Sequence, residues 1–249
     1  MDNTQKFNGK GEIYAKARSS YAEELFIYLK HTVKLAEGSV FADIGSGTGI
    51  FSEQLLNSGY RVYGVEPNDD MRKKAEEGLA KYGNFVSVNG TDSSTTLPMR
   101  SVDCVTAAQA FHWFEPDSFK GECRRILKPD GRVIIVYNVR SESAECNRAL
   151  ADIHRRYCPD FQGFSKGMSD AECRRFFNGD CEVFSADNSR KYDRSGYIAR
   201  ALSSSYSLHE DDEKYEEYLA AMNELFDSFS ENGFLTVPIS TVAYIGKLK

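Results

Sequence analysis

Apolar and polar positions follow two alternating rhythms along the first 140 residues. Short apolar runs predict buried β-strands, and stretches between them repeat their apolar residues at helical spacing. Met71, Ala75 and Leu79, for example, recur every four residues. Strands that alternate with helices through short loops predict right-handed crossovers and an α/β fold with a mostly parallel, doubly wound sheet. The predicted strands span residues 39–44, 61–65, 84–88, 102–108 and 132–137, and the predicted helices lie around 50–56, 71–79 and 119–127.

The pattern changes after residue 141, where helical spacing dominates. We interpret the first part of this region as a helical cap inserted after strand five, over the carboxyl edge of the sheet. A long amphipathic helix further on is expected to pack on the sheet. Pro238 favours an edge position for the last strand or hairpin. In chain order, the pattern predicts helices at 141–157 and 169–177, a strand at 181–185, a helix at 211–229 and the closing strand at 236–248.

These elements predict one domain over residues 1–249, with a sheet of seven strands and a Rossmann-like arrangement. Within it we expect four segments along the chain. They are an N-terminal helical lid at 1–35, a ligand-binding core at 36–140, the cap at 141–178, and closing strands and helices at 179–249.

Composition narrows the possible partners. The chain has 249 residues and a net charge of −6, which disfavours nucleic-acid binding. Its longest apolar runs, such as Leu25 to Leu29, are far shorter than the ~20 residues of a membrane span. The first residues lack the apolar segment of a secretory signal, so we expect a cytoplasmic protein without a membrane partner. Six cysteines and four histidines show no metal-ligand spacing, so no metal is expected.

The most informative stretch is Asp43-Ile44-Gly45-Ser46-Gly47-Thr48-Gly49, which follows a predicted strand and opens a helix. Such glycines let a ligand approach backbone N–H groups at a helix N-terminus. No phosphate-binding P-loop motif is present, and Ile50 stands where a dinucleotide loop needs Gly or Ala. Asp43 would repel a pyrophosphate but suits a cationic ligand. Glu66 ends the next strand, where an acid can accept hydrogen bonds from ribose hydroxyls.

Together these motifs resemble the class I S-adenosylmethionine-dependent methyltransferases, and within them the small-molecule branch called methyltransferase type 11. The resemblance spans about residues 10–140. It rests on the glycine loop, on Val65-Glu66-Pro67-Asn68, on Gly90-Thr91-Asp92-Ser93 with Leu97-Pro98, on Ala108 to Phe114, and on Leu127 to Arg132.

The resemblance implies a cofactor site for S-adenosylmethionine and its product S-adenosylhomocysteine. Asp43, Gly45 and Gly49 would surround the methionine moiety, and Glu66 would hold the ribose. Gln109 would approach the transferred methyl group, and Arg18 would pair with the methionine carboxylate. Asp92 and Ser93 depart from the family pattern, in which Ala and Glu are common. The full expected set is Tyr14, Arg18, Asp43, Ile44, Gly45, Ser46, Gly47, Thr48, Gly49, Glu66, Pro67, Met71, Thr91, Asp92, Ser93, Gln109 and Ala110.

His112 and Trp113 follow the fourth strand, where an acceptor must present its nucleophile. His112 is a candidate general base, because imidazole titrates near neutrality. A structural histidine that hydrogen-bonds the loop is the alternative. Trp113 is a candidate substrate contact, and packing against a helix is its alternative.

Three arginine pairs, at 124–125, 155–156 and 174–175, are compatible with an anionic acceptor or with solvated helix faces. The sequence therefore predicts methyl transfer to a small molecule through an oxygen, nitrogen or carbon nucleophile, with a carboxylate among the options. A protein that binds the cofactor without turnover and an NAD-dependent oxidoreductase remain as alternatives.

Overall fold

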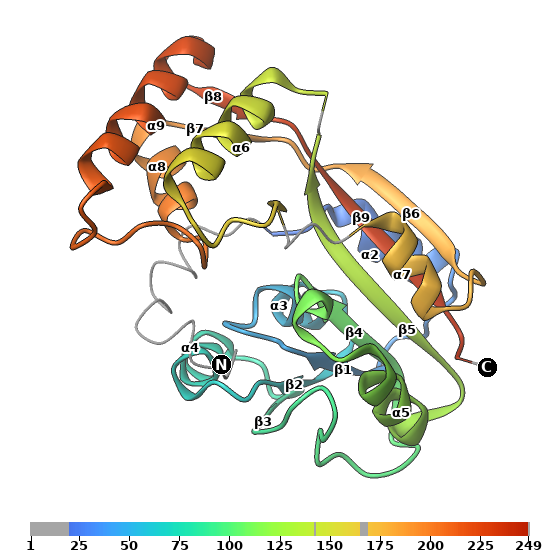
Figure 1. Cartoon of the computed structure of the whole chain (residues 1–249). Coiled ribbons are helices and arrows are strands. Elements are labelled where there is room, and N and C mark those ends of the chain that lie inside the picture. Colours follow the sequence, from blue (N-terminus) through green and yellow to red (C-terminus); the bar gives the residue numbers. More distant parts are fainter. Residues whose placement is uncertain (1–19, 142, 165–168, 249) are drawn as a thin grey trace.

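A computed structural model describes residues 20–141, 143–164 and 169–248. Its centre is a seven-stranded sheet in the order β3-β2-β1-β4-β5-β9-β6 (Figure 1). Strands β1 to β5 are mutually parallel, and β9 runs antiparallel to both of its neighbours. The predicted α/β class and doubly wound topology are thereby confirmed. The strands are β1 (Val40–Ile44), β2 (Arg61–Val65), β3 (Phe85–Val88), β4 (Val102–Ala108), β5 (Leu127–Arg140), β6 (Glu182–Asp187) and β9 (Ile239–Gly246).

Helices cover both faces of this sheet because successive strand residues point to opposite sides. In β5, Ile134 and Val136 pack in one apolar cluster, whereas Val133, Ile135 and Tyr137 pack in another. The first cluster includes α2 (Glu23–His31), α3 (Ile50–Asn57) and the end of α4 (Asp69–Leu79). The second includes α5 (Pro116–Ile126) and α7 (Asp170–Phe176).

Strand β5 is longer at both ends than the predicted 132–137. It starts at Leu127, and the register moves from Val102 opposite Leu127 to Cys104 opposite Arg132. Lys128 to Gly131 therefore bulge between these two pairs. At the other end β5 continues to Arg140, because β9 pairs with it along the whole way to Ile239.

A third apolar cluster lies apart from the sheet and forms what we call the cap. It contains α6 (Glu145–Tyr157), α8 (Arg194–Leu202) and α9 (Tyr215–Phe229). A small sheet of β7 (Arg190–Tyr192) and β8 (Leu235–Val237) completes it. Figure 1 shows the cap beyond the end of β5, on the side to which that strand points.

The cap corrects two expectations about the second half of the chain. The amphipathic helix α9 packs against α6 and α8 rather than on the sheet, with Tyr218, Met222 and Phe226 buried in the cap. Conversely, α7 packs Cys173 and Phe176 into the sheet cluster. The cap was expected to span residues 141–178. In the structure it includes α8 and α9, which follow residue 178, and it excludes α7.

The closing strand corrects a third expectation. Pro238 separates β8, in the cap, from β9, in the central sheet. Strand β9 lies between β5 and β6 and is not at an edge. Proline lacks an N–H donor, so it is tolerated at the break between two strands rather than within a ladder. Among the described residues, no helix is both long and apolar enough to cross a bilayer.

Candidate active site

A cavity of about 260 Å³ lies between the carboxyl ends of the parallel strands and the cap. This is the edge at which open α/β sheets bind ligands. The loops after β1 to β4 form one side, and residues of α6, α8 and the segment after α8 form the other. Of the residues expected from the sequence, the cavity is lined by Gly45, Ser46, Gly47, Thr48, Glu66, Pro67, Met71, Thr91, Asp92, Gln109, Ala110, His112 and Trp113.

The glycine loop after β1 is tied to the end of β2. The N–H groups of Gly45 and Ser46 both donate to the carbonyl oxygen of Val65, at 2.9 and 3.2 Å. Gly45 has a φ of +70°, and a Cβ there would lie 2.7 Å from the Cβ of Ala110. Only glycine fits this position, so the loop can pass close to the chain that follows β4. The backbone at the cavity floor is held in one conformation as a result.

Glu66 is buried at the end of β2 and lines the cavity. Gly47 N–H donates to Oε2 and Asn68 N–H donates to Oε1, each at 2.9 Å. Burial raises the pKa of Glu66, and the two backbone hydrogen bonds oppose that rise. Each carboxylate oxygen has a second lone pair, so the group can still accept hydrogen bonds from a ligand.

Asp43 lies beneath the loop and is not among the described residues that line the cavity. Its two carboxylate oxygens accept hydrogen bonds from the hydroxyls of Ser52 (2.7 Å) and Thr106 (2.9 Å). Burial is the main cause that raises the pKa of Asp43 to about 6. The hydroxyl donors lower it, and the charge of Glu66 adds to the rise. Asp43 therefore joins β1, α3 and β4 under the loop.

Three further expected residues also lie away from the cavity wall. Ile44 is wholly buried in the sheet cluster. Gly49 precedes α3 with a φ of +84°, and a Cβ on it would lie 2.7 Å from Leu79 Cδ1. Ser93 is exposed and its hydroxyl lies 3.3 Å from that of Thr91. These three residues shape the neighbouring loops rather than the cavity. Tyr14 and Arg18 lie outside the described residues.

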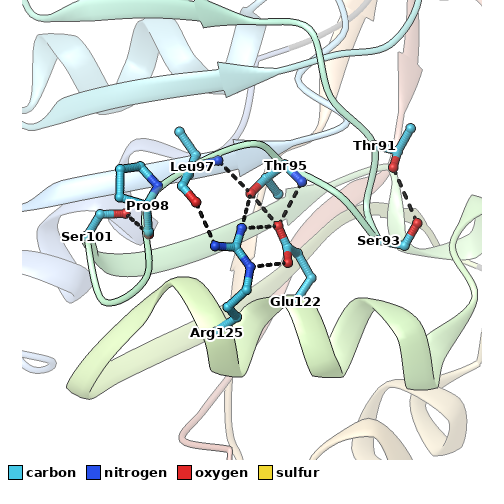
Figure 2. A network of polar contacts seen from close by, with 8 residues as sticks. All are labelled: Thr91, Ser93, Thr95, Leu97, Pro98, Ser101, Glu122 and Arg125. Atoms are coloured by element: carbon cyan, nitrogen blue, oxygen red, sulfur yellow. Dashed lines mark hydrogen bonds and ion pairs between the residues drawn. The ribbon is translucent and has the colours of Figure 1, made fainter.

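The loop after β3 brings Thr91 and Asp92 to the cavity. Thr91 and Ser94 exchange backbone hydrogen bonds of 3.0 and 3.4 Å, which closes the turn. Burial raises the pKa of Asp92. Below the turn, Glu122 of α5 accepts hydrogen bonds from the backbone and hydroxyl of Thr95 (Figure 2). Helix α5 thus holds this loop in place from beneath.

The segment after β4 places Gln109, His112 and Trp113 along the cavity. Gln109 has a φ of +54°, and its side-chain amide donates to the carbonyl oxygen of Asn138 at 3.2 Å. His112 and Trp113 belong to a short 3-10 helix, η2 (Phe111–Trp113), with their ring centroids 5.0 Å apart. Both rings are therefore positioned by the segment that follows β4, the strand that lies between β1 and β5 in the sheet.

A buried tyrosine on β5 holds His112. The backbone N–H of His112 donates to the hydroxyl of Tyr137 at 3.0 Å, and Nδ1 of the ring lies 3.2 Å from the same oxygen. Burial raises the pKa of Tyr137 well above its usual range, so the phenol keeps its proton. The phenol oxygen can also accept a hydrogen bond from Nδ1–H, which orients the ring and leaves Nε2 with the lone pair that a general base needs.

Sequence reasoning missed the far side of the cavity. Arg140 is the last residue of β5, His154 lies on α6 and Arg200 on α8. No local motif marks them, because they come together only when the cap folds over the sheet. The other lining residues outside the expected set are Tyr21, Ile50, Ala108, Phe114, Asn138, Phe164, Ser204, Ser205, Tyr206 and Ile239.

The six arginines of the three pairs are absent from the described cavity wall. Arg155 and Arg174 make ion pairs with Asp152 and Asp170 on their own helices. Arg125 binds Glu122. The helix-face interpretation fits Arg155 and Arg174, whereas Arg125 binds a buried carboxylate beneath the loop after β3.

Comparison with known proteins agrees with this architecture. The profile of a family described as a methyltransferase domain matches residues 42–135. An uncharacterized methyltransferase of Mycobacterium tuberculosis is 32% identical over 152 residues, which is 61% of this chain and 60% of that protein. An uncharacterized methyltransferase of Geobacillus sp. (strain WCH70) is 30% identical over 156 residues, which is 61% of this chain and 70% of that protein. The chain thus spans about 60% of the length of the first of these relatives.

Solved structures show the same fold. The YcgJ protein of Bacillus subtilis has a TM-score of 0.60 at 18% identity, over 92% of this chain and 100% of that one. A SAM-dependent methyltransferase of Geobacter sulfurreducens, solved in complex with S-adenosyl-L-homocysteine, has a TM-score of 0.54 at 15% identity, over 96% and 98%. With the family profile over the glycine loop and strands β1 to β5, the chain belongs to the class I S-adenosylmethionine-dependent methyltransferases.

Proposed function

We propose that this chain transfers a methyl group from S-adenosylmethionine to a small-molecule acceptor held between η2 and the cap. The observation that carries the proposal is the junction of the glycine loop with Glu66. The N–H of Gly47 donates to the buried carboxylate of Glu66, and both residues line the cavity. The backbone of the glycine loop is therefore exposed to a ligand in the cavity. The solved relative that contains S-adenosyl-L-homocysteine supports the same cofactor for this chain.

The residues present fit this cofactor. The carboxylate of Glu66 accepts hydrogen bonds from the ribose hydroxyls, and buried Met71 with Pro67 offers apolar contact to the adenine. Thr48 is at the cavity wall, and its buried hydroxyl oxygen has no hydrogen-bond partner among the described residues. A ligand in the loop would supply one. The acids at this end favour a cationic sulfonium over a pyrophosphate.

When bound, S-adenosylmethionine supplies an electrophilic methyl group on sulfur. The bond from sulfur to that carbon would break as the bond to the acceptor forms, with its electron pair left on sulfur, so S-adenosylhomocysteine would be the product. The chain holds the acceptor in line behind the methyl group and shields it from water. His112 would accept, at Nε2, the proton that the acceptor's nucleophile loses, with its ring held by Tyr137.

Titration calorimetry with S-adenosylmethionine and S-adenosylhomocysteine tests the cofactor site. Wild type should bind both, and Glu66→Gln should bind them at least about tenfold more weakly, because it loses charge-assisted hydrogen bonds. Glu53→Gln is the matched control, since Glu53 lies on α3, is 42% exposed and pairs with Lys81. Circular dichroism of each variant verifies folding.

A folded wild type that binds neither ligand would refute the proposal, and a nicotinamide titration would then test the oxidoreductase alternative. Binding of both ligands without release of S-adenosylhomocysteine on any acceptor would favour the non-catalytic alternative.

A further inference from the structure

The cavity is electrically polarised from one end to the other. Its only described acidic lining residues are Glu66, after β2, and Asp92, in the loop after β3. Its described arginines are Arg140, at the end of β5, and Arg200, in α8. Strands β1 and β4 separate β2 from β5, and neighbouring strands lie about 4.8 Å apart, so the two ends are roughly 14 Å apart across the sheet. Arg140 also lies four residues further along β5 than Val136, which pairs with the last residue of β4. A ligand that bridges them meets negative charge at one end and positive charge at the other.

Arg140 is held by neutral groups. Its Nη1 donates to the side-chain oxygen of Asn147 at 3.0 Å, and its guanidinium lies 5.0 Å from the ring centre of Phe164. It makes no ion pair with any carboxylate that the structure describes. A half-buried guanidinium with three or more remaining N–H donors is a ready partner for an anion.

His154 lies close enough to Arg140 and Arg200 for their positive charges to affect its pKa. It is 1% exposed, lines the cavity, and lies with Nδ1 3.3 Å from the hydroxyl of Tyr218. Burial, followed by the charges of Arg140 and Arg200, lowers the pKa of His154 to about 3. The imidazole is therefore neutral near pH 7, and the two arginines supply the positive charge here.

The surroundings of the two arginines are those of a recognition site for a small acid. Ser205 and Tyr206, which follow α8, line the same cavity and carry hydroxyl groups. The rings of Phe164 and Tyr206 lie 6.1 and 5.0 Å from that of His154, so aromatic rings form part of the wall at this end. Planar guanidinium groups match carboxylate geometry, and hydroxyls complete its hydrogen bonds.

We propose that Arg140 and Arg200 bind a carboxylate group of the methyl acceptor, beneath the cap and at the opposite end of the cavity from Glu66. This proposal rests on the proposed function. It makes the acceptor a small carboxylic acid with an apolar body. The carboxylate of this acceptor lies next to Phe164 and Tyr206. The apolar body of the acceptor extends along Trp113 toward the glycine loop.

The first titration measures S-adenosylhomocysteine on wild type, Arg140→Gln, Arg200→Gln and the control Arg156→Gln. Arg156 is exposed on α6 and contacts only the ring of Tyr157 in the described structure. All four proteins should bind the product with affinities within twofold of each other. Loss of that binding in Arg140→Gln would overturn the proposal, because the arginine would then serve the cofactor's own carboxylate. If wild type did not bind S-adenosylhomocysteine, the proposed function would be refuted as well.

The second titration uses protein saturated with S-adenosylhomocysteine. The probes are benzoate, trans-cinnamate, hexanoate and succinate, each paired with its amide, and inorganic phosphate. At least one acid should bind, and its amide should bind about tenfold more weakly or worse. Arg140→Gln and Arg200→Gln should each weaken the acid about tenfold, Arg140→Lys less, and Arg156→Gln not at all.

Several results of this second titration would overturn the proposal while leaving the cofactor site intact. They are equal binding of acids and amides, unchanged acid binding in the two arginine variants, binding of phosphate but of none of the acids, and no binding of any probe.

Discussion

Asp43 and Glu66 are two acidic residues next to the glycine loop, and their surroundings give them different roles. Each oxygen of Asp43 accepts one hydrogen bond from a hydroxyl, and each oxygen of Glu66 accepts one from a backbone N–H. The difference is that Asp43 is buried beneath the loop, whereas Glu66 lines the cavity. A carboxylate whose partners are all buried supports its loop. A carboxylate with spare lone pairs at a cavity wall can bind a ligand.

His112 is the residue whose chemical role is most open to direct measurement. We expect His112→Ala to lower kcat for methyl transfer by about ten- to a hundredfold, because it loses a group that handles the acceptor's proton. The affinity for S-adenosylhomocysteine should stay within twofold. Release of S-adenosylhomocysteine in steady state, on an acid that binds in the titrations above, provides the measurement.

Tyr137→Phe is the companion variant, since it keeps the imidazole and removes only the hydroxyl that holds it. The kcat of Tyr137→Phe should lie between that of wild type and that of His112→Ala. Full turnover by His112→Ala at unchanged cofactor affinity would show that the ring is only structural.

At the scale of elements, α5 supports the loop after β3 through one buried network (Figure 2). Glu122 accepts hydrogen bonds from Thr95 and from Arg125, and Arg125 also donates to the carbonyl oxygen of Leu97 at 2.7 Å. Burial raises the pKa of Glu122, but the hydrogen bonds and the charge of Arg125 outweigh it and bring that pKa to about 2. The loop that carries Thr91 and Asp92 therefore depends on an ionised carboxylate.

Replacing that carboxylate should destabilise the fold in a pH-dependent way. The pKa of Glu122 is lower in the folded chain than in the unfolded one, so its stabilisation is complete above the ordinary glutamate value of 4.5 and is lost as pH falls toward 2. Glu122→Gln should lower the free energy of unfolding by about 2–3 kcal/mol at pH 7.

Urea denaturation at pH 7, 5.5 and 4 measures this difference, which should shrink at the lowest pH. Glu77→Gln is the control, because Glu77 is 51% exposed and pairs with Lys74 on the surface; it should change stability by less than about 0.5 kcal/mol. A difference for Glu122→Gln that is constant over this range would contradict the account.

At the scale of the whole molecule, the protein has two apolar bodies with the cavity between them. The sheet clusters share no residue with the cap cluster, and the long β5 and the pair β8 and β9 lead from one to the other (Figure 1). We therefore expect each body to lose stability largely independently of the other. Arg140 belongs to the strand that enters the cap, so the anion end of the cavity depends on how the two bodies meet.

Met222→Ala should loosen the cap selectively. Met222 is fully buried in the cap cluster, and its truncation should lower local stability by about 2–5 kcal/mol. Hydrogen exchange should accelerate in α6, α8 and α9 and stay unchanged in β1, β4 and β5. Ile134→Ala, in the sheet cluster, is the control that should accelerate exchange in the strands. Equal acceleration in both bodies after Met222→Ala would show that they unfold together.

The sequence by itself determined the sheet and the floor of the cavity. Strands at 61–65 and 102–108 were predicted with the observed bounds, and the positions of Gly45, Gly47 and Glu66 followed from the motif. These features are local. Hydrophobic periodicity and the backbone needs of a tight turn act within a few residues, so they can be read directly along the chain.

Only the tertiary structure decided the roof of the cavity and which acid faces it. Amphipathic spacing shows that α9 has an apolar face, but the same face could cover a sheet or other helices, and here it meets α6 and α8. Arg140, His154 and Arg200 are far apart in sequence and converge only because the cap closes over the end of β5. Contacts between distant segments depend on how whole surfaces fit together, and no local pattern in the chain encodes that fit.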